Sequence, residues 1–131
     1  MIVVDTNVIL HLWLETPETA AAEALLESDS EWGAPLLWRS EIRNALALLI
    51  RHRSFPLQAA KEIVRSAEEL MAGREFAVPS DDVLDLAQRS GCSAYDCEFV
   101  ALAVALDVPL VTTDRKVLRA FPKTARALRP R

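Results

Sequence analysis

The sequence has little of what usually marks a disulfide-bonded or zinc-binding protein. Only 3 of its 131 residues are glycine, 2 are cysteine and 2 are histidine. Cys92 and Cys97 have no second cysteine or histidine pair that would complete a metal site, so we interpret them as reduced thiols that pack in the core. His11 and His52 stand alone on predicted helices, where we expect structural or solvent-facing roles. These shortages argue against a disulfide scaffold and against a zinc centre.

Long apolar runs, low-complexity stretches and linker-like segments are missing as well. The longest apolar stretches are too short, or too interrupted by charge, to cross a bilayer, and the N-terminus enters a strand pattern with no basic leader. A chain of 131 residues with 51% hydrophobic content can bury a core without disulfides. We therefore expect a single domain over residues 1–131 that is cytoplasmic and does not associate with a membrane.

Strand and helix signals alternate along the whole chain. The pattern predicts strands over residues 2–5, 32–35, 76–78, 110–113 and 125–128. It predicts helices over residues 7–14, 37–52, 56–72, 80–90 and 94–106. It also predicts a further helix that begins at Pro17 and a short helix near Val117. We expect Ser80 to cap its helix, with Asp81 and Asp82 in the first turn. This alternation predicts an α/β sandwich around a parallel sheet.

Four acids stand where such a fold would bring them to one edge of the sheet. Asp5 ends the first apolar strand and Asp114 follows a later one, and ligands of parallel sheets gather at the carboxyl ends of strands. Asp96 comes three, four and seven residues before apolar positions of its helix, so it begins a stripe that faces the core. Glu41 precedes a similar stripe. We therefore expect the four carboxylates to converge.

Converging carboxylates need a counterion, because two unit charges about 4 Å apart repel by roughly 4 kcal/mol at an effective dielectric near 20. Oxygen ligands favour Mg²⁺ or Mn²⁺ over zinc. Thr6, Asn7 and Thr112 lie beside these acids and offer supporting hydroxyl and amide groups. Each residue also has a purely structural explanation. Asp5 and Asp114 are suited to cap helices, Ser93 and Asp96 form a capping-box pattern, and the three polar neighbours suit turns.

The charge is unevenly distributed. The net charge is −4, yet residues 115–131 contain seven Lys or Arg and no acid. A basic segment that begins directly after Asp114 suits a substrate with a phosphate backbone. A solvated, solubilising tail explains the same composition. The sequence leaves both interpretations open.

Four short motifs together resemble the PIN-domain family, and in particular its small VapC-type toxins. The resemblance extends over nearly the whole chain, in order and at similar spacing. The motifs are Val4-Asp5-Thr6-Asn7, Glu41-Ile42-Arg43-Asn44-Ala45, Tyr95-Asp96 leading into Ala101-Leu102-Ala103, and Leu110-Val111-Thr112-Thr113-Asp114.

The resemblance implies a three-layer α/β/α sandwich with a central parallel sheet of four to five strands, and a metal-dependent endoribonuclease. It implies that Asp5, Glu41, Asp96 and Asp114 are the catalytic, metal-binding acids, with Mg²⁺ or Mn²⁺ as cofactor. It also implies a homodimer, an RNA substrate and, for the toxin branch, a cognate antitoxin protein. Some relatives carry a further acid after the last aspartate, where this chain has Arg115-Lys116.

Two other functions compete with this hypothesis. Phosphoryl hydrolysis by an aspartyl nucleophile expects a second acid two residues after the first aspartate, where this chain has Asn7. A non-catalytic RNA- or peptide-binding module with an acidic pocket is the stronger alternative. Neither the RNA that is cut nor toxicity in the host can be read from the sequence.

Overall fold

Five parallel strands form one sheet in the order β3-β2-β1-β4-β5. The computed structural model describes residues 1–129, so Arg131 of the basic segment lies outside the described residues. The strands are β1 (Ile2–Val4), β2 (Trp32–Pro35), β3 (Glu75–Phe76), β4 (Leu110–Thr112) and β5 (Ala125–Ala127). The predicted parallel sheet is confirmed, and β1, in its centre, is buried along its whole length.

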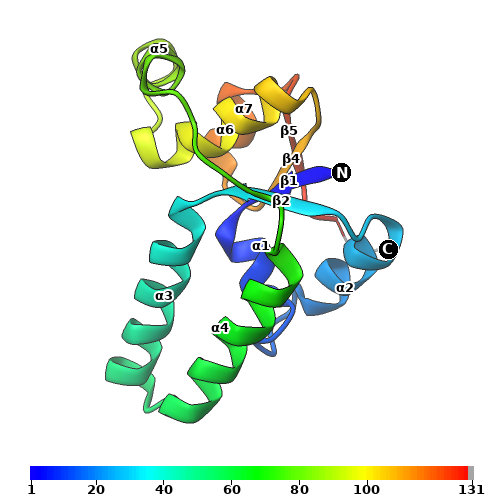
Figure 1. Cartoon of the computed structure of the whole chain (residues 1–131), viewed down its shortest axis with the longest axis vertical. Coiled ribbons are helices and arrows are strands. Elements are labelled where there is room, and N and C mark those ends of the chain that lie inside the picture. The colour runs from blue at the N-terminus through cyan, green and yellow to red at the C-terminus, as the bar shows by residue number, and fades with distance from the viewer. Residues whose placement is uncertain (130–131) are drawn as a thin grey trace.

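Helices cover both faces of the sheet and give the three layers of an α/β/α sandwich (Figure 1). The helices are α1 (Thr6–His11), α2 (Thr19–Ser28), α3 (Leu37–Arg53), α4 (Leu57–Met71), α5 (Ser80–Ser90), α6 (Ala94–Leu106) and α7 (Arg115–Ala120). One face carries α1 to α4, and the other carries α6 with α5 and α7 beside it (Figure 1). Within residues 1–129 no helix is long and apolar enough to span a membrane.

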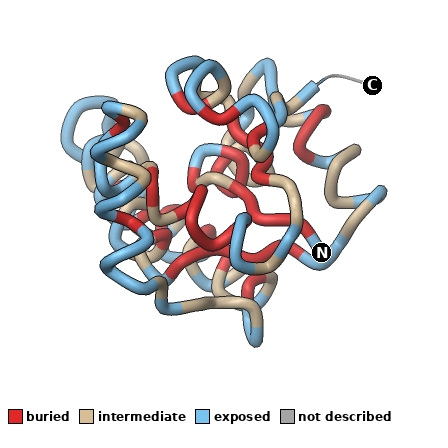
Figure 2. Tube along the Cα trace, turned by 90° about the horizontal axis from the view of Figure 1, so that it is seen from above, coloured by how far each residue is buried: buried red, intermediate tan, exposed pale blue. Residues whose placement is uncertain are grey.

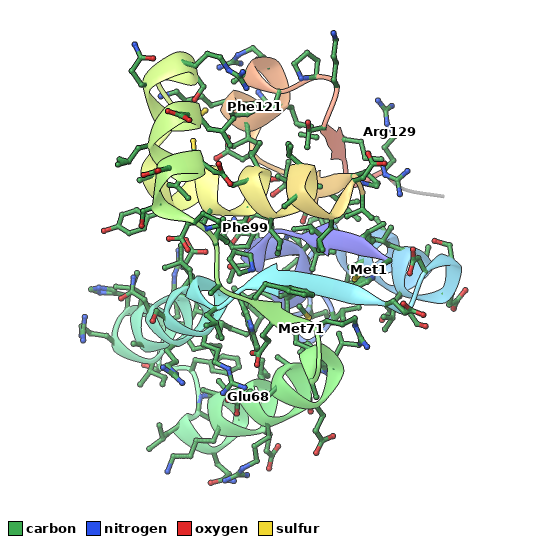
Figure 3. All side chains as sticks on the ribbon, turned by 45° about the horizontal axis from the view of Figure 1, so that its top comes forward. Met1, Glu68, Met71, Phe99, Phe121 and Arg129 are labelled. Carbon is green, nitrogen blue, oxygen red and sulfur yellow. The ribbon has the colours of Figure 1, made fainter. Side chains whose placement is uncertain are left out.

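The core lies on both sides of the central strands. Phe99 of α6 packs on one face of the sheet and Met71, at the end of α4, on the other (Figure 3). Figure 2 shows the buried residues gathered around the sheet, with exposed positions on the outer helices. Helix α6 is buried on nearly every side between Cys97 and Ala103, because it lies between the sheet and α5. Cys92 and Cys97 are buried free thiols, as predicted.

Several predicted boundaries are wrong for local reasons. The first helix ends at His11 rather than residue 14, and the second begins at Thr19 rather than Pro17. Between them the Thr19 hydroxyl accepts a hydrogen bond from the Thr16 amide at 3.0 Å and donates one to the Leu14 carbonyl at 2.7 Å. These bonds hold residues 14–19 in a turn, so the proline lies in that turn instead of in a helix.

Ser80 does not cap α5. Pro79 takes the cap position with an extended backbone, and Ser80 is the first helical residue, so its hydroxyl makes no capping bond. The strand predicted over residues 76–78 is a two-residue strand at 75–76. Its Glu75 carboxylate accepts hydrogen bonds from Arg39 Nε and from Nε1 of the buried Trp38, each at 2.7 Å. These contacts fix the edge strand of the sheet. The remaining elements lie within one or two residues of their predicted positions.

Candidate active site

The carboxyl ends of the parallel strands converge on one pocket. Asp5 directly follows β1, and its backbone amide donates to the Val111 carbonyl at 3.0 Å, which holds it beside the neighbouring strand β4. Asp114 lies two residues beyond the end of β4. Because β1 and β4 are adjacent and parallel, the two carboxylates reach the same edge.

The two helical acids reach this edge from opposite faces of the sheet. Glu41 lies in the second turn of α3, which follows β2, and Asp96 lies in the first turn of α6. The pocket has a volume of about 280 Å³ and gathers all four predicted acids with two of the three predicted polar residues. Its lining residues are Asp5, Thr6, Asn7, Glu41, Asn44, Ala45, Leu48, Asp96 and Asp114.

The carboxylate of Asp5 is fixed through both of its oxygens. Oδ1 accepts from the Thr6 amide at 2.7 Å, at the start of α1, and Oδ2 accepts from the Thr112 hydroxyl at 2.7 Å. Thr112 does not line the pocket. It is fully buried beneath it, and its hydroxyl also accepts from the Asp114 amide at 3.0 Å. This threonine therefore ties the two strand-end aspartates together.

Glu41 is held by a contact between helices. The Thr6 hydroxyl, which is buried, donates to Oε1 of Glu41 at 2.7 Å. Sequence periodicity could not fix the orientation of α3, because this helix is apolar on nearly every side beyond Ala45. The hydrogen bond settles that question: Glu41 points toward the strand ends, and its other oxygen has no hydrogen bond within the described chain.

Asp114 and Asp96 combine structural and pocket roles. Asp114 caps α7, with Oδ1 accepting from the Val117 amide at 3.0 Å. Ser93 caps α6, with its hydroxyl accepting from the Asp96 amide at 3.1 Å. The cap explanation is thus correct for Asp5 and Asp114, and it does not compete with the pocket, because a carboxylate oxygen has further lone pairs. The capping bonds orient these side chains at the pocket wall.

Burial and neighbouring negative charges disfavour the ionised form of Asp5 in the pocket. Burial raises the pKa of Asp5, and the negative charges of Asp96 and Asp114 raise it further, while the hydrogen bonds from Thr112 and Thr6 oppose the rise. An ionised Asp5 is therefore less favourable here than in water. A cation bound in the pocket would favour the ionised form of Asp5 again.

The same pattern holds for the two helical acids. Burial raises the pKa of Glu41, and the charges of Asp5 and Asp96 add to the effect. Burial also raises the pKa of Asp96, with Asp114 adding to it and the Lys116 ammonium opposing it. The charges of Asp5, Glu41 and Asp96 thus interact through space, and the titrations of these three groups are coupled.

The donor set of the pocket fits a hard divalent cation. Its lining supplies carboxylate, hydroxyl and amide oxygens, the ligands that Mg²⁺ and Mn²⁺ prefer. Within residues 1–129, however, no group of three or more acidic, histidine or cysteine side chains is close enough together to hold a metal ion. A cation bound by the side chains as they stand would therefore take one or two carboxylates from the pocket and complete its coordination with water or substrate oxygens.

One polar residue of the pocket escaped the sequence analysis. Asn44 lines the pocket three residues after Glu41, on the same face of α3. The i, i+3 spacing from Glu41 could have identified it once the phase of that helix was known. Ala45 and Leu48 line the pocket as well, at four and seven residues after Glu41. The predicted core-facing stripe of this helix is wrong, because its buried residues are Trp38, Ile42 and Leu46, whereas Leu48 is exposed at the pocket.

A comparison with family models decides the classification. The model described as PIN domain matches residues 2–125 of the chain. The chain belongs to the PIN-domain family. PIN domains are generally nucleases. A search of curated proteins found no match.

Solved structures share the fold of this PIN domain. FitAcB from Neisseria gonorrhoeae is similar with a TM-score of 0.75 and 20% identity, over 99% of this chain and 98% of that one. PAE2754 from Pyrobaculum aerophilum gives 0.70 and 22%, over 96% and 89%. A toxin–antitoxin complex from Klebsiella pneumoniae gives 0.72 and 15%, over 100% of both chains. At these identities the likeness establishes the α/β/α fold alone.

Proposed function

We propose that this PIN domain is an endoribonuclease that hydrolyses RNA phosphodiester bonds with Mg²⁺ or Mn²⁺, and that it is the toxin of a type II toxin–antitoxin pair. The observation that carries the proposal is the convergence of Asp5, Glu41, Asp96 and Asp114, from four separate elements, on one pocket at the carboxyl edge of the sheet. Membership of a family of nucleases supports the reaction type.

The residues of the pocket have distinct roles in this proposal. Asp5, Asp96 and Asp114 are the metal ligands, and the buried Thr112 keeps Asp5 and Asp114 in register. A divalent cation held there supplies neutralisation of phosphate charge and activation of a water molecule. Glu41 has a raised pKa and an oxygen that is not bonded to Thr6, so it is suited to act as a further ligand or to orient and deprotonate that water.

The neighbouring polar groups complete the pocket. Thr6 holds Glu41 through its hydroxyl, so it acts on the reaction through Glu41 and is a positioning residue. Asn7 and Asn44 are exposed at the pocket and offer amide groups that can donate to a phosphate oxygen. The protein thus contributes mainly by positioning charge and phosphate.

The toxin assignment rests on the structural neighbours. One of them is a toxin–antitoxin complex, and another is FitAB bound to a DNA fragment. By analogy we propose a homodimer with a small cognate antitoxin. A short open reading frame for a DNA-binding protein directly upstream of the gene, whose product copurifies with this chain, is the expected observation.

The test is RNA cleavage by purified protein. Structured and unstructured RNAs, with a DNA of the same sequence, are incubated with wild type in Mg²⁺, Mn²⁺ or EDTA. We expect discrete, metal-dependent cuts in RNA. Asp96→Asn, purified identically, should abolish them, and Asp85→Asn, at an exposed position of α5 outside the acidic pocket, should not.

One observation favours the competing binding module. Within residues 1–129 no three acidic, histidine or cysteine side chains form a group that could hold a metal ion. A module of that kind would retain RNA or a basic peptide with no cuts in any metal. Cuts that persist undiminished in Asp96→Asn would instead identify a contaminating nuclease and overturn the assignment of the pocket.

A further inference from the structure

The basic C-terminal segment is part of the fold. Val117, Phe121 and Ala125 are buried, so residues 115–127 pack against the domain as α7 and β5. The explanation of this segment as a solubilising tail is therefore wrong for these residues. Their cations occupy fixed places on the surface.

Three of these cations share one face of α7. Arg115, Lys116 and Arg119 are all exposed, whereas Val117 points into the core. At about 100° per residue, the three cations fall within an arc of about 100° on the side opposite Val117. We call Arg115, Lys116 and Arg119 the α7 ridge.

No side chain within residues 1–129 forms an ion pair with the α7 ridge. The ion pairs there involve the N-terminus, His11 and Arg39, and none reaches the ridge. Arg115 and Arg119 are four residues apart, a spacing at which like charges destabilise a helix. A fixed group of unpaired cations is suited to an anionic ligand.

The α7 ridge adjoins the acidic pocket. Asp114, a pocket residue, is the cap from which α7 starts, so Arg115 and Lys116 are the next two residues of the chain. Nζ of Lys116 donates to the Gly91 carbonyl at 2.8 Å, in the loop that leads into α6 and Asp96. This bond places the ammonium between the two helices that contribute Asp114 and Asp96.

We propose that the α7 ridge binds backbone phosphates of the RNA beside the scissile bond and so brings a polyanion to a pocket of carboxylates. The inference rests on the proposed nuclease function. Four acids repel an approaching RNA, and neighbouring cations offset that repulsion before the phosphate reaches the pocket. Arginine is suited to this task because its planar guanidinium can donate two hydrogen bonds to one phosphate.

The test measures binding without cleavage. A short fluorescein-labelled single-stranded RNA is titrated with protein in EDTA at several salt concentrations, and anisotropy gives the affinity. The ridge variant carries Arg115→Gln, Lys116→Gln and Arg119→Gln. The matched control carries Lys123→Gln, Arg126→Gln and Arg129→Gln. It has the same charge change within the same segment, and its residues line two other hollows that share no residue with the acidic pocket.

We expect the ridge variant to bind RNA on the order of 100-fold more weakly than wild type at about 0.1 M salt and about 10-fold more weakly near 0.3 M. Its salt slope should fall by about 2, since each phosphate contact on a single strand contributes roughly 0.7. The control should retain nearly wild-type affinity and slope. Circular dichroism should show both variants folded, because all six side chains are exposed.

Three results would overturn the inference. Wild-type affinity in the ridge variant would show that α7 does not contact RNA. Equal weakening in both variants would show a general effect of net charge. The same titration is repeated with labelled poly-glutamate in place of RNA. If the ridge variant loses binding to poly-glutamate and keeps its binding to RNA, the ridge would be assigned to an acidic protein partner. The nuclease proposal fails separately: if wild type binds RNA through the ridge and yet makes no cuts in Mg²⁺ or Mn²⁺, only the catalytic assignment falls.

Discussion

Replacing Asp96 by asparagine should abolish RNA cleavage and at the same time stabilise the metal-free protein. Asp96 is half-buried, and its charge acts on those of Asp5, Glu41 and Asp114. For carboxylate charges taken as on the order of 7 Å apart in a water-like dielectric, each such pair repels by about 0.6 kcal/mol. Removal of the Asp96 charge therefore relieves about 1.8 kcal/mol of repulsion in total, before screening by salt.

The helix offsets part of this gain. Asp96 lies in the first turn of α6, where a negative charge is favourable by about 0.3–1 kcal/mol. The net expectation is a stabilisation of about 1 kcal/mol, equivalent to a rise of about 3–5 °C in melting temperature for a domain of this size. Asp85→Asn, which removes one charge from the exposed surface of α5, should change stability by less than about 0.5 kcal/mol.

The assay is thermal unfolding followed by circular dichroism, in EDTA and in about 10 mM Mg²⁺. If the metal binds wild type with a dissociation constant near 1 mM, it adds about 1.4 kcal/mol of stability. Asp96→Asn should lose most of that increment. A lower melting temperature for Asp96→Asn in EDTA, or an equal response of both proteins to Mg²⁺, would refute the reasoning.

Three further predictions concern groups around the pocket and the sheet edge. Thr112→Val should destabilise the fold by about 1–3 kcal/mol in urea unfolding, because the amide of Asp114 loses its buried acceptor, and it should slow cleavage, because Asp5 loses its anchor; unchanged stability would contradict the anchoring role. Glu75→Gln should cost about 2 kcal/mol by the same measurement, with cleavage unaffected, because the charge-assisted bonds to this carboxylate lie outside the pocket. The stability of metal-free wild type should depend on pH with a definite sign. The folded pKa values of Asp5, Glu41 and Asp96 are raised, so the native state takes up protons first and these groups add stability as pH falls from neutral toward the ordinary carboxyl range. Glu75 acts in the opposite sense, since its hydrogen bonds from Arg39 lower its folded pKa and its contribution disappears at acid pH. Urea titrations of wild type and Glu75→Gln over pH 3–8 would separate the two contributions; a pocket contribution that falls with falling pH would contradict the assignment.

Sequence reasoning predicted the fold because its strongest signals are local. Alternating apolar strands and long helical segments predict an α/β sandwich, and the observed five-stranded parallel sheet confirms it. The errors lie at boundaries where one or two contacts decide the outcome. The turn held by Thr19 and the cap position of Pro79 are examples. Neither contact can be identified from periodicity alone.

The pocket could be predicted from strand ends, but its internal order could not. That Asp5 and Asp114 meet follows from adjacent parallel strands. A buried threonine joins these two aspartates, and Thr6 of one helix holds Glu41 of another. Both contacts depend on the rotation of each element about its own axis, which the sequence does not give. Asn44 was missed for the same reason. The single domain, the homodimer, the antitoxin and the roles of the site residues stay predictions.

Calorimetric titration of Mn²⁺ into the purified protein tests the central claim most directly. The account predicts saturable binding of at least one ion by wild type, together with a proton release that increases as pH falls, since protons on carboxylates of raised pKa must leave as the cation binds. It predicts much weaker binding by Asp96→Asn. Absence of Mn²⁺ uptake by folded wild type, or equal uptake by both proteins, would contradict the proposed metal-dependent nuclease.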